Sequence, residues 1–106
     1  MSWQLFVLGP AEEDICQAVS YYESVAPEQV TRFLDNIQTV INDVERYPFA
    51  SEPQPNGLRR RSVKGFPYSV WADLDEASQI VAIVGVVHQK RNPTVIARRE
   101  QSNYQS

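Results

Sequence analysis

The densest group of residues that could do chemistry is a run of three arginines, Arg59, Arg60 and Arg61, followed by Lys64. In an extended strand Arg59 and Arg61 share one face and Arg60 takes the other. Guanidinium groups bind phosphates and carboxylates through paired hydrogen bonds, so this cluster predicts an anion site. The alternative is that some of these arginines form ion pairs with the chain's own acids, for example on the second helix.

His88 is the only histidine, and it lies between the most apolar segment of the chain and the basic residues Lys90 and Arg91. It is a candidate general base. The alternative is a residue at the end of a strand that satisfies a backbone group. One histidine and one cysteine cannot build a typical metal site, so we expect no metal and no cofactor. The chain has no glycine-rich phosphate loop, so any catalysis must rest on arginine, lysine and histidine, which can stabilise developing phosphate charge.

Other reactive or aromatic side chains have simpler interpretations. Trp71 falls on the polar face of its segment, which predicts an exposed anchor for a protein partner, with burial under the C-terminal tail as the alternative. Tyr21, Tyr22 and Tyr47 fall in helical patterns and are predicted to lie in the core or at its edge. Cys16 also falls in a helical pattern and is predicted to be a small apolar filler.

The elements that must position these residues follow from the apolar pattern. Apolar residues at helical spacing predict one helix from Pro10 to the Ala26–Pro27 step and a second helix from Pro27 to Pro48. Alternating or continuous apolar runs predict strands over residues 3–8, 58–63, 68–74 and 80–87. Residues 49–57 contain Pro53, Pro55 and Gly57 and are predicted to form an irregular connection.

The predicted architecture is an α+β fold with element order βααβββ. An antiparallel sheet, made mostly from the C-terminal half, packs one face on a helical hairpin. The other face, with Trp71 and some of the arginines, is expected to be open. The 106 residues suit one domain over 1–106, with a polar tail at about 100–106.

Charge is divided unevenly along the chain. Residues 1–58 carry nine acidic and two basic residues, whereas residues 59–106 carry eight basic and four acidic residues. This division predicts a polar molecule with a basic face. The overall pI of about 5.0 does not suit binding of nucleic acid by bulk charge. Neither a membrane-spanning run nor a signal peptide is evident, so we expect a cytoplasmic protein without membrane contact.

Several motifs in this order resemble the RelE/ParE toxin superfamily, over about residues 3 to 99. They are Ala11-Glu12-Glu13-Asp14-Ile15 leading to Tyr21-Tyr22, Phe33-Leu34 through Ile41 to Pro48, Leu58-Arg59-Arg60, Phe66-Pro67-Tyr68-Ser69-Val70, and Val87-His88-Gln89-Lys90-Arg91-Asn92-Pro93 with Arg98. The resemblance implies the toxin of a type II toxin–antitoxin, or plasmid stabilisation, system that causes growth arrest. It also implies a cognate antitoxin that lays a helix across the helical hairpin and an extended segment along the sheet, in a toxin–antitoxin hetero-oligomer. An acidic antitoxin segment would suit the basic C-terminal half.

The superfamily contains two kinds of toxin, and the resemblance to ParE is the closer one. ParE-like toxins inhibit DNA gyrase by direct binding, whereas RelE-like toxins are endoribonucleases that cut messenger RNA on the ribosome. RelE-like enzymes often carry a tyrosine near the C-terminus, but this chain has Pro93-Thr94-Val95-Ile96-Ala97 there, and Tyr104 lies in the polar tail. The Phe66-Pro67-Tyr68 turn and the ending from His88 to Pro93 also favour a ParE-like protein that is not an enzyme.

The resemblance implies two sets of site residues and leaves a third function open. The set for binding the target or the antitoxin is Arg59, Arg60, Lys64, Trp71, Lys90, Arg91 and Arg98. If the chain is a ribonuclease, His88 would be the base and Arg59, Arg61 and Arg98 would stabilise phosphate charge. The third alternative is an inactive toxin fold that serves only as an interaction module.

Overall fold

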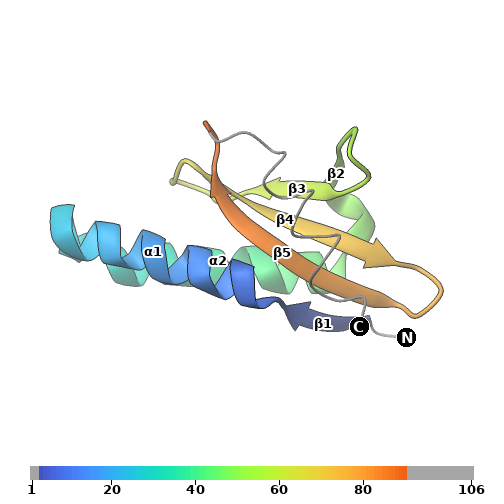
Figure 1. The fold of residues 1–106 in the computed structure, drawn as a ribbon. Coiled ribbons are helices and arrows are strands. Elements are labelled where there is room, and N and C mark those ends of the chain that lie inside the picture. Colours follow the sequence, from blue (N-terminus) through green and yellow to red (C-terminus); the bar gives the residue numbers. More distant parts are fainter. Residues whose placement is uncertain (1–2, 91–106) are drawn as a thin grey trace.

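The helices and strands of the chain follow the predicted order (Figure 1). A computed structural model describes residues 3–90. Its helices are α1 (Gly9–Val25) and α2 (Val30–Arg46), and two short 3-10 turns, η1 (Pro27–Gln29) and η2 (Pro48–Ala50), follow them. Its strands are β1 (Gln4–Val7), β2 (Glu52–Pro53), β3 (Arg59–Ser62), β4 (Tyr68–Asp75) and β5 (Ile80–His88).

Prolines set the limits of both helices, as predicted. The residue before a proline avoids the helical region, so α1 stops at Val25 and α2 stops at Arg46. Pro27 opens a single 3-10 turn, and the second α-helix begins only at Val30. The connection over residues 49–57 is less irregular than predicted, because it contains the end of η2 and the short strand β2.

The five strands form one sheet in the order β1-β5-β4-β3-β2. Strands β2 to β5 are antiparallel neighbours, as expected. Strand β1 differs, because it pairs in parallel with β5, with Phe6 opposite Ala82. This pairing places β5 between β1 and β4, which agrees with the prediction that the strand apolar on both faces is central.

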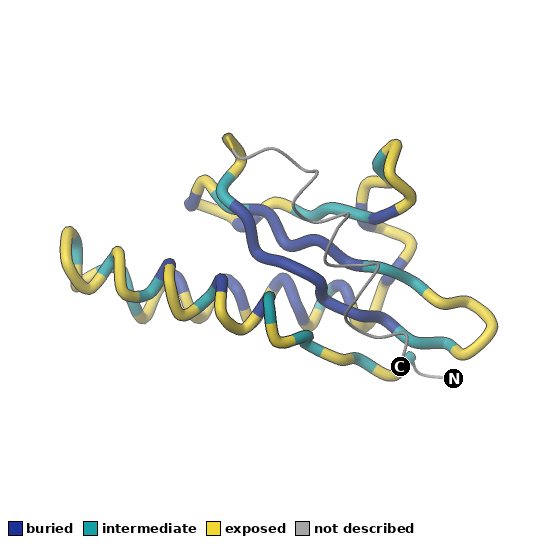
Figure 2. Tube along the Cα trace, in the orientation of Figure 1, coloured by how far each residue is buried: buried dark blue, intermediate teal, exposed yellow. Residues whose placement is uncertain are grey.

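The main core lies between the sheet and the helical hairpin. Both helices cover the same face of the sheet, and the buried parts of β4 and β5 face the inner sides of the helices (Figures 1 and 2). Phe33 from α2, Val70 from β4 and Ile83 from β5 are almost completely buried there. The predicted α+β fold with a helical hairpin on one face is therefore confirmed. None of the described helices combines the length and the hydropathy that crossing a bilayer requires.

The sheet face away from the helices carries a second apolar cluster, which the sequence analysis did not predict. Trp71 belongs to it and is only 6% exposed, so the prediction of an exposed tryptophan anchor is wrong. Trp71 pairs with Gly85 across the strands, and a register shift follows immediately between Trp71 and Ala72. The remaining buried members of the cluster are Leu58, Ala82, Val84 and Val87.

Candidate functional site

Arg59 binds the backbone of the segment that connects η2 to β2. Its Nη1 donates hydrogen bonds to the carbonyl oxygens of Ser51 (2.9 Å) and Phe49 (3.3 Å). The guanidinium also lies 5.1 Å from the centroid of the Phe49 ring. This geometry combines hydrogen bonding with a cation–π contact, so Arg59 has a structural role that satisfies backbone carbonyls between η2 and β2.

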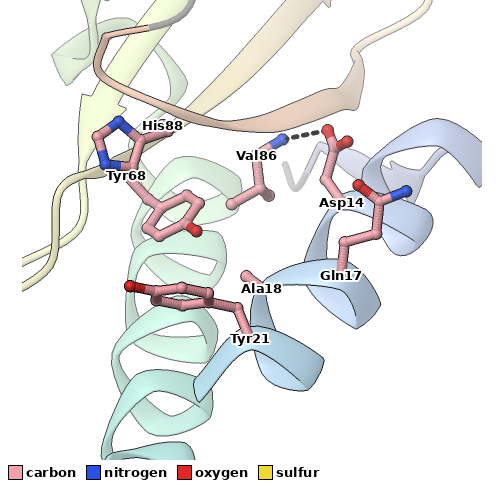
Figure 3. Close-up of a pocket in the computed structure, with 7 residues that line it drawn as sticks. All are labelled: Asp14, Gln17, Ala18, Tyr21, Tyr68, Val86 and His88. Atoms are coloured by element: carbon pink, nitrogen blue, oxygen red, sulfur yellow. Dashed lines mark hydrogen bonds between the residues drawn. The ribbon is translucent and has the colours of Figure 1, made fainter. Parts of the chain in front are cut away.

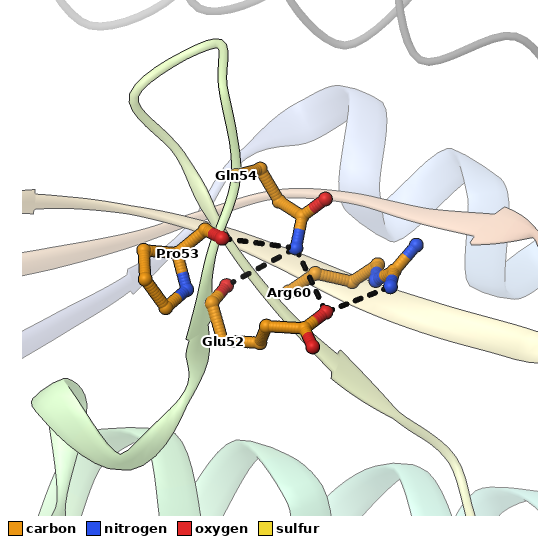
Figure 4. Close-up of polar contacts among 4 residues, drawn as sticks. All are labelled: Glu52, Pro53, Gln54 and Arg60. Carbon is orange, nitrogen blue, oxygen red and sulfur yellow. Dashed lines mark hydrogen bonds and ion pairs between the residues drawn. The ribbon is translucent and has the colours of Figure 1, made fainter.

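Arg60 is paired on the opposite face of β3. Its Nη2 donates to Glu52 Oε1 at 2.8 Å, and Gln54 Nε2 donates to the same oxygen at 2.9 Å (Figure 4). The hydrogen bond from Arg60 is the main reason that the pKa of Glu52 is lowered, and the bond from Gln54 adds to it. The guanidinium also lies 5.9 Å from the Trp71 ring, so it borders the second apolar cluster.

Arg61 completes the set by pairing with an acid on the second helix. Its Nη2 lies 3.8 Å from Asp43 Oδ2, and its side chain is 32% exposed. Arg60 and Arg61 therefore pair with acids of the chain, as the alternative interpretation of the cluster predicted for some of the arginines, and Arg59 binds backbone carbonyls instead. Lys64 and Lys90 form no ion pair with another residue of the described range 3–90, and the same holds for Arg32 and Arg46.

His88 ends β5 and also satisfies a backbone group. Its Nδ1 accepts a hydrogen bond from the backbone N–H of Lys90 at 3.2 Å, which places the ring proton on Nε2. The imidazole packs edge-to-face on Tyr68, with ring centroids 5.3 Å apart. Both features match the interpretation of His88 as a strand-end residue, and they leave Nε2 as its hydrogen-bond donor.

The structure does not bring His88 together with the arginines of β3. His88 faces α1, whereas Arg61 pairs with α2 and Arg59 contacts the connection after α2. Strand β4 lies between β3 and β5, so these residues come from strands about 10 Å apart. Arg91 and Arg98, the remaining predicted site residues, lie outside the described part of the chain.

A cavity lies beside His88, between α1 and the sheet (Figure 3). Its volume is about 230 Å³, and the side chains of Tyr21 and Tyr68 project into it. A second hollow of about 440 Å³ adjoins it and shares Tyr21, Tyr68 and His88. The other residues around the first cavity are Asp14, Gln17, Ala18 and Val86, and those around the second are Tyr22, Val25 and Pro67.

Asp14 positions one wall of this cavity, and the sequence analysis missed it. Its carboxylate is buried and accepts a hydrogen bond from the backbone N–H of Val86 at 2.9 Å. Strand β1 pairs with β5 only as far as Ile83, so none of the described strands lies beside Val86 on that side. The Asp14 carboxylate accepts the hydrogen bond that a backbone carbonyl of a neighbouring strand would otherwise accept. A signal was available, because Asp14 falls on the helix face of Ala11 and Ala18, three and four residues away.

Several side chains on the helices are more exposed than predicted. Tyr22 does lie at the core edge, 5.3 Å from the Phe33 ring, and burial is the main reason that its pKa is raised. Tyr21 and Tyr47 are each 57% exposed, so their predicted burial is wrong. Cys16 is also exposed and is not a core filler. Tyr21 continues the stripe of Asp14 and Ala18 at helical spacing, but it lies at the exposed end of that stripe, beside the cavity.

The chemistry available at this site is that of polar and aromatic side chains. Within the described residues, no group of three or more histidine, cysteine, aspartate or glutamate side chains could hold a metal ion. The cavity instead offers an imidazole N–H, two phenols, an amide and a carboxylate. These groups suit recognition of another molecule by hydrogen bonds and ring contacts.

Comparisons with known proteins agree on one family. The family model for the ParE toxin of the type II toxin-antitoxin system parDE matches residues 6–93. Toxin ParE2 of Mycobacterium tuberculosis is 31% identical over 98 residues, which cover 91% of this chain and 90% of the relative. Proteins of the same name from two strains give the same match.

Two solved structures share the fold. One belongs to the chromosomal ParDE toxin–antitoxin system of P. aeruginosa, with a TM-score of 0.70 and 14% identity over 81% of this chain and 95% of that one. The other is the toxin–antitoxin complex RelBE2 of Mycobacterium tuberculosis, with a TM-score of 0.57 and 15% identity over 83% of this chain and 99% of that one. At these identities the likeness concerns the fold alone.

Proposed function

Because the chain belongs to the ParE toxin family of type II toxin–antitoxin systems, we propose that it is a toxin that a cognate antitoxin neutralises and that it stops growth by binding DNA gyrase. The main support for gyrase rather than messenger RNA as the target is that strand β4 separates His88 from Arg59 and Arg61. A phosphate-cleaving site needs its base and its cations around one reacting group. The described residues lack that convergence, which favours inhibition by protein binding over cleavage of messenger RNA.

The arrangement of charge also supports a protein target. The arginines of β3 contact Ser51, Glu52 and Asp43, so they do not form a free cluster of cations that could neutralise phosphates. Binding to nucleic acid depends strongly on the number of phosphates that the protein neutralises. Lys64, Lys90, Arg91 and Arg98 are the cations we propose for the contact with gyrase, with Arg91 and Arg98 as its centre.

An antitoxin partner fits the open features of the fold. Within residues 3–90, strand β1 forms one edge of the sheet, and the short strand β2 covers β3 only along Arg59 and Arg60. Uncovered strand edges can accept an added strand, and the exposed sides of α1 and α2 can accept a helix. The two solved structures described above come from toxin–antitoxin systems, which supports the proposal of such a partner.

The test is induced expression of the chain alone in a bacterial host, with growth, the DNA-damage response and messenger RNA integrity measured together. We expect growth arrest with a DNA-damage response and intact messages. Arrest with cleaved messages and no DNA damage would instead support the ribonuclease alternative. The absence of any growth defect would support an inactive interaction module.

Variants connect the result to particular residues. Arg91→Glu and Arg98→Glu should each abolish toxicity while the purified proteins keep the wild-type unfolding curve. Arg46→Glu is the matched control, because it makes the same charge change at an exposed position of α2 outside the proposed contact. His88→Ala should remain toxic. If both reversals leave toxicity intact, the proposed gyrase contact is wrong.

A further inference from the structure

The second apolar cluster lies on the face of the sheet that α1 and α2 do not cover (Figure 1). Ala82 and Val84 of β5 alternate with Val81 and Ile83, which belong to the main core on the opposite face. Trp71 of β4 is the largest side chain of the cluster. The cluster therefore forms an apolar surface on the outer side of the sheet.

This surface is more deeply buried than its place in the fold explains. Trp71 keeps only 6% of its exposure, and its neighbours in the cluster shield it from the sides. Side chains stand roughly perpendicular to a sheet, so a large ring stays open to water unless other atoms lie above it. The guanidinium of Arg60 lies 5.9 Å from the indole, but one small planar group covers only part of a tryptophan. A further segment is therefore needed above the cluster.

A buried polar atom at one end of the surface points to the kind of segment. Ser69 lies directly opposite Val87 in the pairing of β4 with β5, so both side chains are on the same face. Ser69 is buried, and its Oγ forms no hydrogen bond with residues 3–90. A buried hydroxyl without a partner is costly. A backbone that crosses the surface would bring N–H and C=O groups to this hydroxyl.

The chain itself contains a segment of suitable composition. Residues 91–106 follow β5 after a turn at residues 89–90. They contain one apolar run, Val95-Ile96-Ala97. A segment tethered to β5 has an effective concentration of roughly millimolar at the surface, which favours it over a second copy of the chain.

The reach of this segment matches the surface. Five residue steps of β5 separate Val87 from Ala82, which is about 17 Å along the strand. Residues 93–98 also make five steps and span about the same length when extended. If the chain reverses direction over residues 89–92, the apolar run comes to lie opposite the centre of the surface.

We propose that residues 93–98 dock on the second apolar cluster, with Val95 and Ile96 over Trp71 and Val84. The docking builds on the proposed function, because Arg91 and Arg98 flank this segment and form the centre of the proposed gyrase contact. It would hold both arginines on the face of the sheet opposite the helical hairpin.

The first test measures how accessible Trp71 is in the full chain. Trp3→Phe leaves Trp71 as the only tryptophan, and quenching of its fluorescence by acrylamide reports the exposure of the indole. In this background, Val95→Ser with Ile96→Ser should raise the quenching constant several-fold, because the apolar contact that holds the segment is lost.

The matched control for this test is Val25→Ser with Leu34→Ser, which removes two exposed apolar side chains from the helices. Its quenching constant should equal that of the Trp3→Phe chain. Circular dichroism and unfolding curves establish that each variant is folded. An unchanged quenching constant in Val95→Ser with Ile96→Ser would overturn the docking.

The second test identifies the segment by a disulfide. In a Cys16→Ser background, Val84→Cys is combined with Val95→Cys or with Ile96→Cys, because adjacent side chains of an extended segment point to opposite sides. One of the two pairs should form an internal disulfide on mild oxidation, since docking brings its Cβ atoms close enough. The same tail cysteines with Cys16 retained and Val84 unchanged should form none, because Cys16 is exposed on α1.

Two outcomes of the oxidation would overturn the docking. One is the absence of an internal disulfide from both pairs, or equal formation with Cys16. The other is a covalent dimer in place of the internal disulfide, which would mean that a second copy of the chain covers the surface.

Toxicity is measured separately, so the docking and the proposed function can fail independently. Failure of the docking in a chain whose toxicity depends on Arg91 would leave the proposed function standing. Docking in a chain that does not arrest growth would support the docking and refute the proposed function. With both in place, Val95→Ser with Ile96→Ser should lose toxicity, and full toxicity would overturn the role of the docking in holding Arg91 and Arg98.

Discussion

The hydrogen bond between Asp14 and Val86 connects the first helix to the central strand, and its loss should be measurable. Asp14→Ala removes the carboxylate that accepts the Val86 N–H at 2.9 Å and leaves that N–H buried. Strand β1 ends at Val7, so within residues 3–90 no neighbouring strand places a backbone carbonyl where it could accept this N–H instead. A buried donor without a partner loses its solvation without compensation.

The expected loss of stability follows from two opposing effects. A hydrogen bond to a charged group contributes about 1.5–3 kcal/mol. Alanine is a better helix former than aspartate by roughly 0.5 kcal/mol, which offsets part of that loss. The free energy of unfolding should therefore fall by about 1–2.5 kcal/mol, which corresponds to a decrease in Tm of roughly 5–15 °C for a domain of this size.

Urea unfolding followed by circular dichroism measures this difference. Glu13→Ala is the matched control, because it removes the same charge from the adjacent, exposed position of α1, and its free energy of unfolding should change by less than about 0.5 kcal/mol. Asp14→Asn keeps an oxygen acceptor and should fall between the two. Amide hydrogen exchange adds a local measurement, since the Val86 N–H should lose protection in Asp14→Ala.

One result would refute this reasoning. If Asp14→Ala and Glu13→Ala unfold at the same urea concentration with the same slope, and the Val86 amide stays equally protected, the carboxylate does not hold β5. The wall of the cavity beside His88 would then be positioned by apolar packing alone.

Two further predictions concern side chains whose roles the structure assigned. Arg59→Ala should lower the free energy of unfolding by about 1–2 kcal/mol in urea denaturation, because it removes hydrogen bonds to the backbone carbonyls of Ser51 and Phe49. The control, Lys64→Ala, should change the free energy of unfolding by less than about 0.5 kcal/mol. Equal effects of the two substitutions would contradict a structural role for Arg59. The raised pKa of Tyr22 means that the folded state holds this proton more tightly than the unfolded state, so its contribution to stability is present below pH 10 and is lost as the pH rises through the folded pKa. Absorbance at 295 nm should therefore show a late-ionising tyrosine that disappears in Tyr22→Phe, and an unchanged titration would contradict the assignment.

Much of the fold could be predicted because its signals are local. The apolar stripe of α2, with Phe33, Ile37 and Val44 buried, repeats at helical spacing within one segment. Proline limits both helices through its own geometry, whatever packs around it. The strands at 68–75 and 80–88 were recognised for the same reason, since alternation and apolar content are properties of consecutive residues.

The candidate site was less predictable because its residues meet through pairings distant in sequence. Asp14 and Val86 are 72 residues apart, and nothing near Asp14 indicates that a strand leaves an N–H without a partner. Trp71 alternates with the polar residues Ser69 and Asp73, and it is buried because the fold places it in an apolar cluster with residues of other strands and of the segment before β3. The arginines of β3 were singled out by their charge, but their partners are backbone carbonyls and acids that the fold brings to them.

The amino-acid sequence by itself determined the helices, most strands, the division of charge and the likeness to a toxin family, because each depends on the order of residues along the chain. Only the tertiary structure decided that β1 pairs in parallel with β5, that the arginines of β3 are internally paired, and that α1 and the sheet enclose a cavity. The physical reason is that side-chain periodicity specifies which face of an element is apolar, whereas register and strand order specify what that face and each polar group will meet.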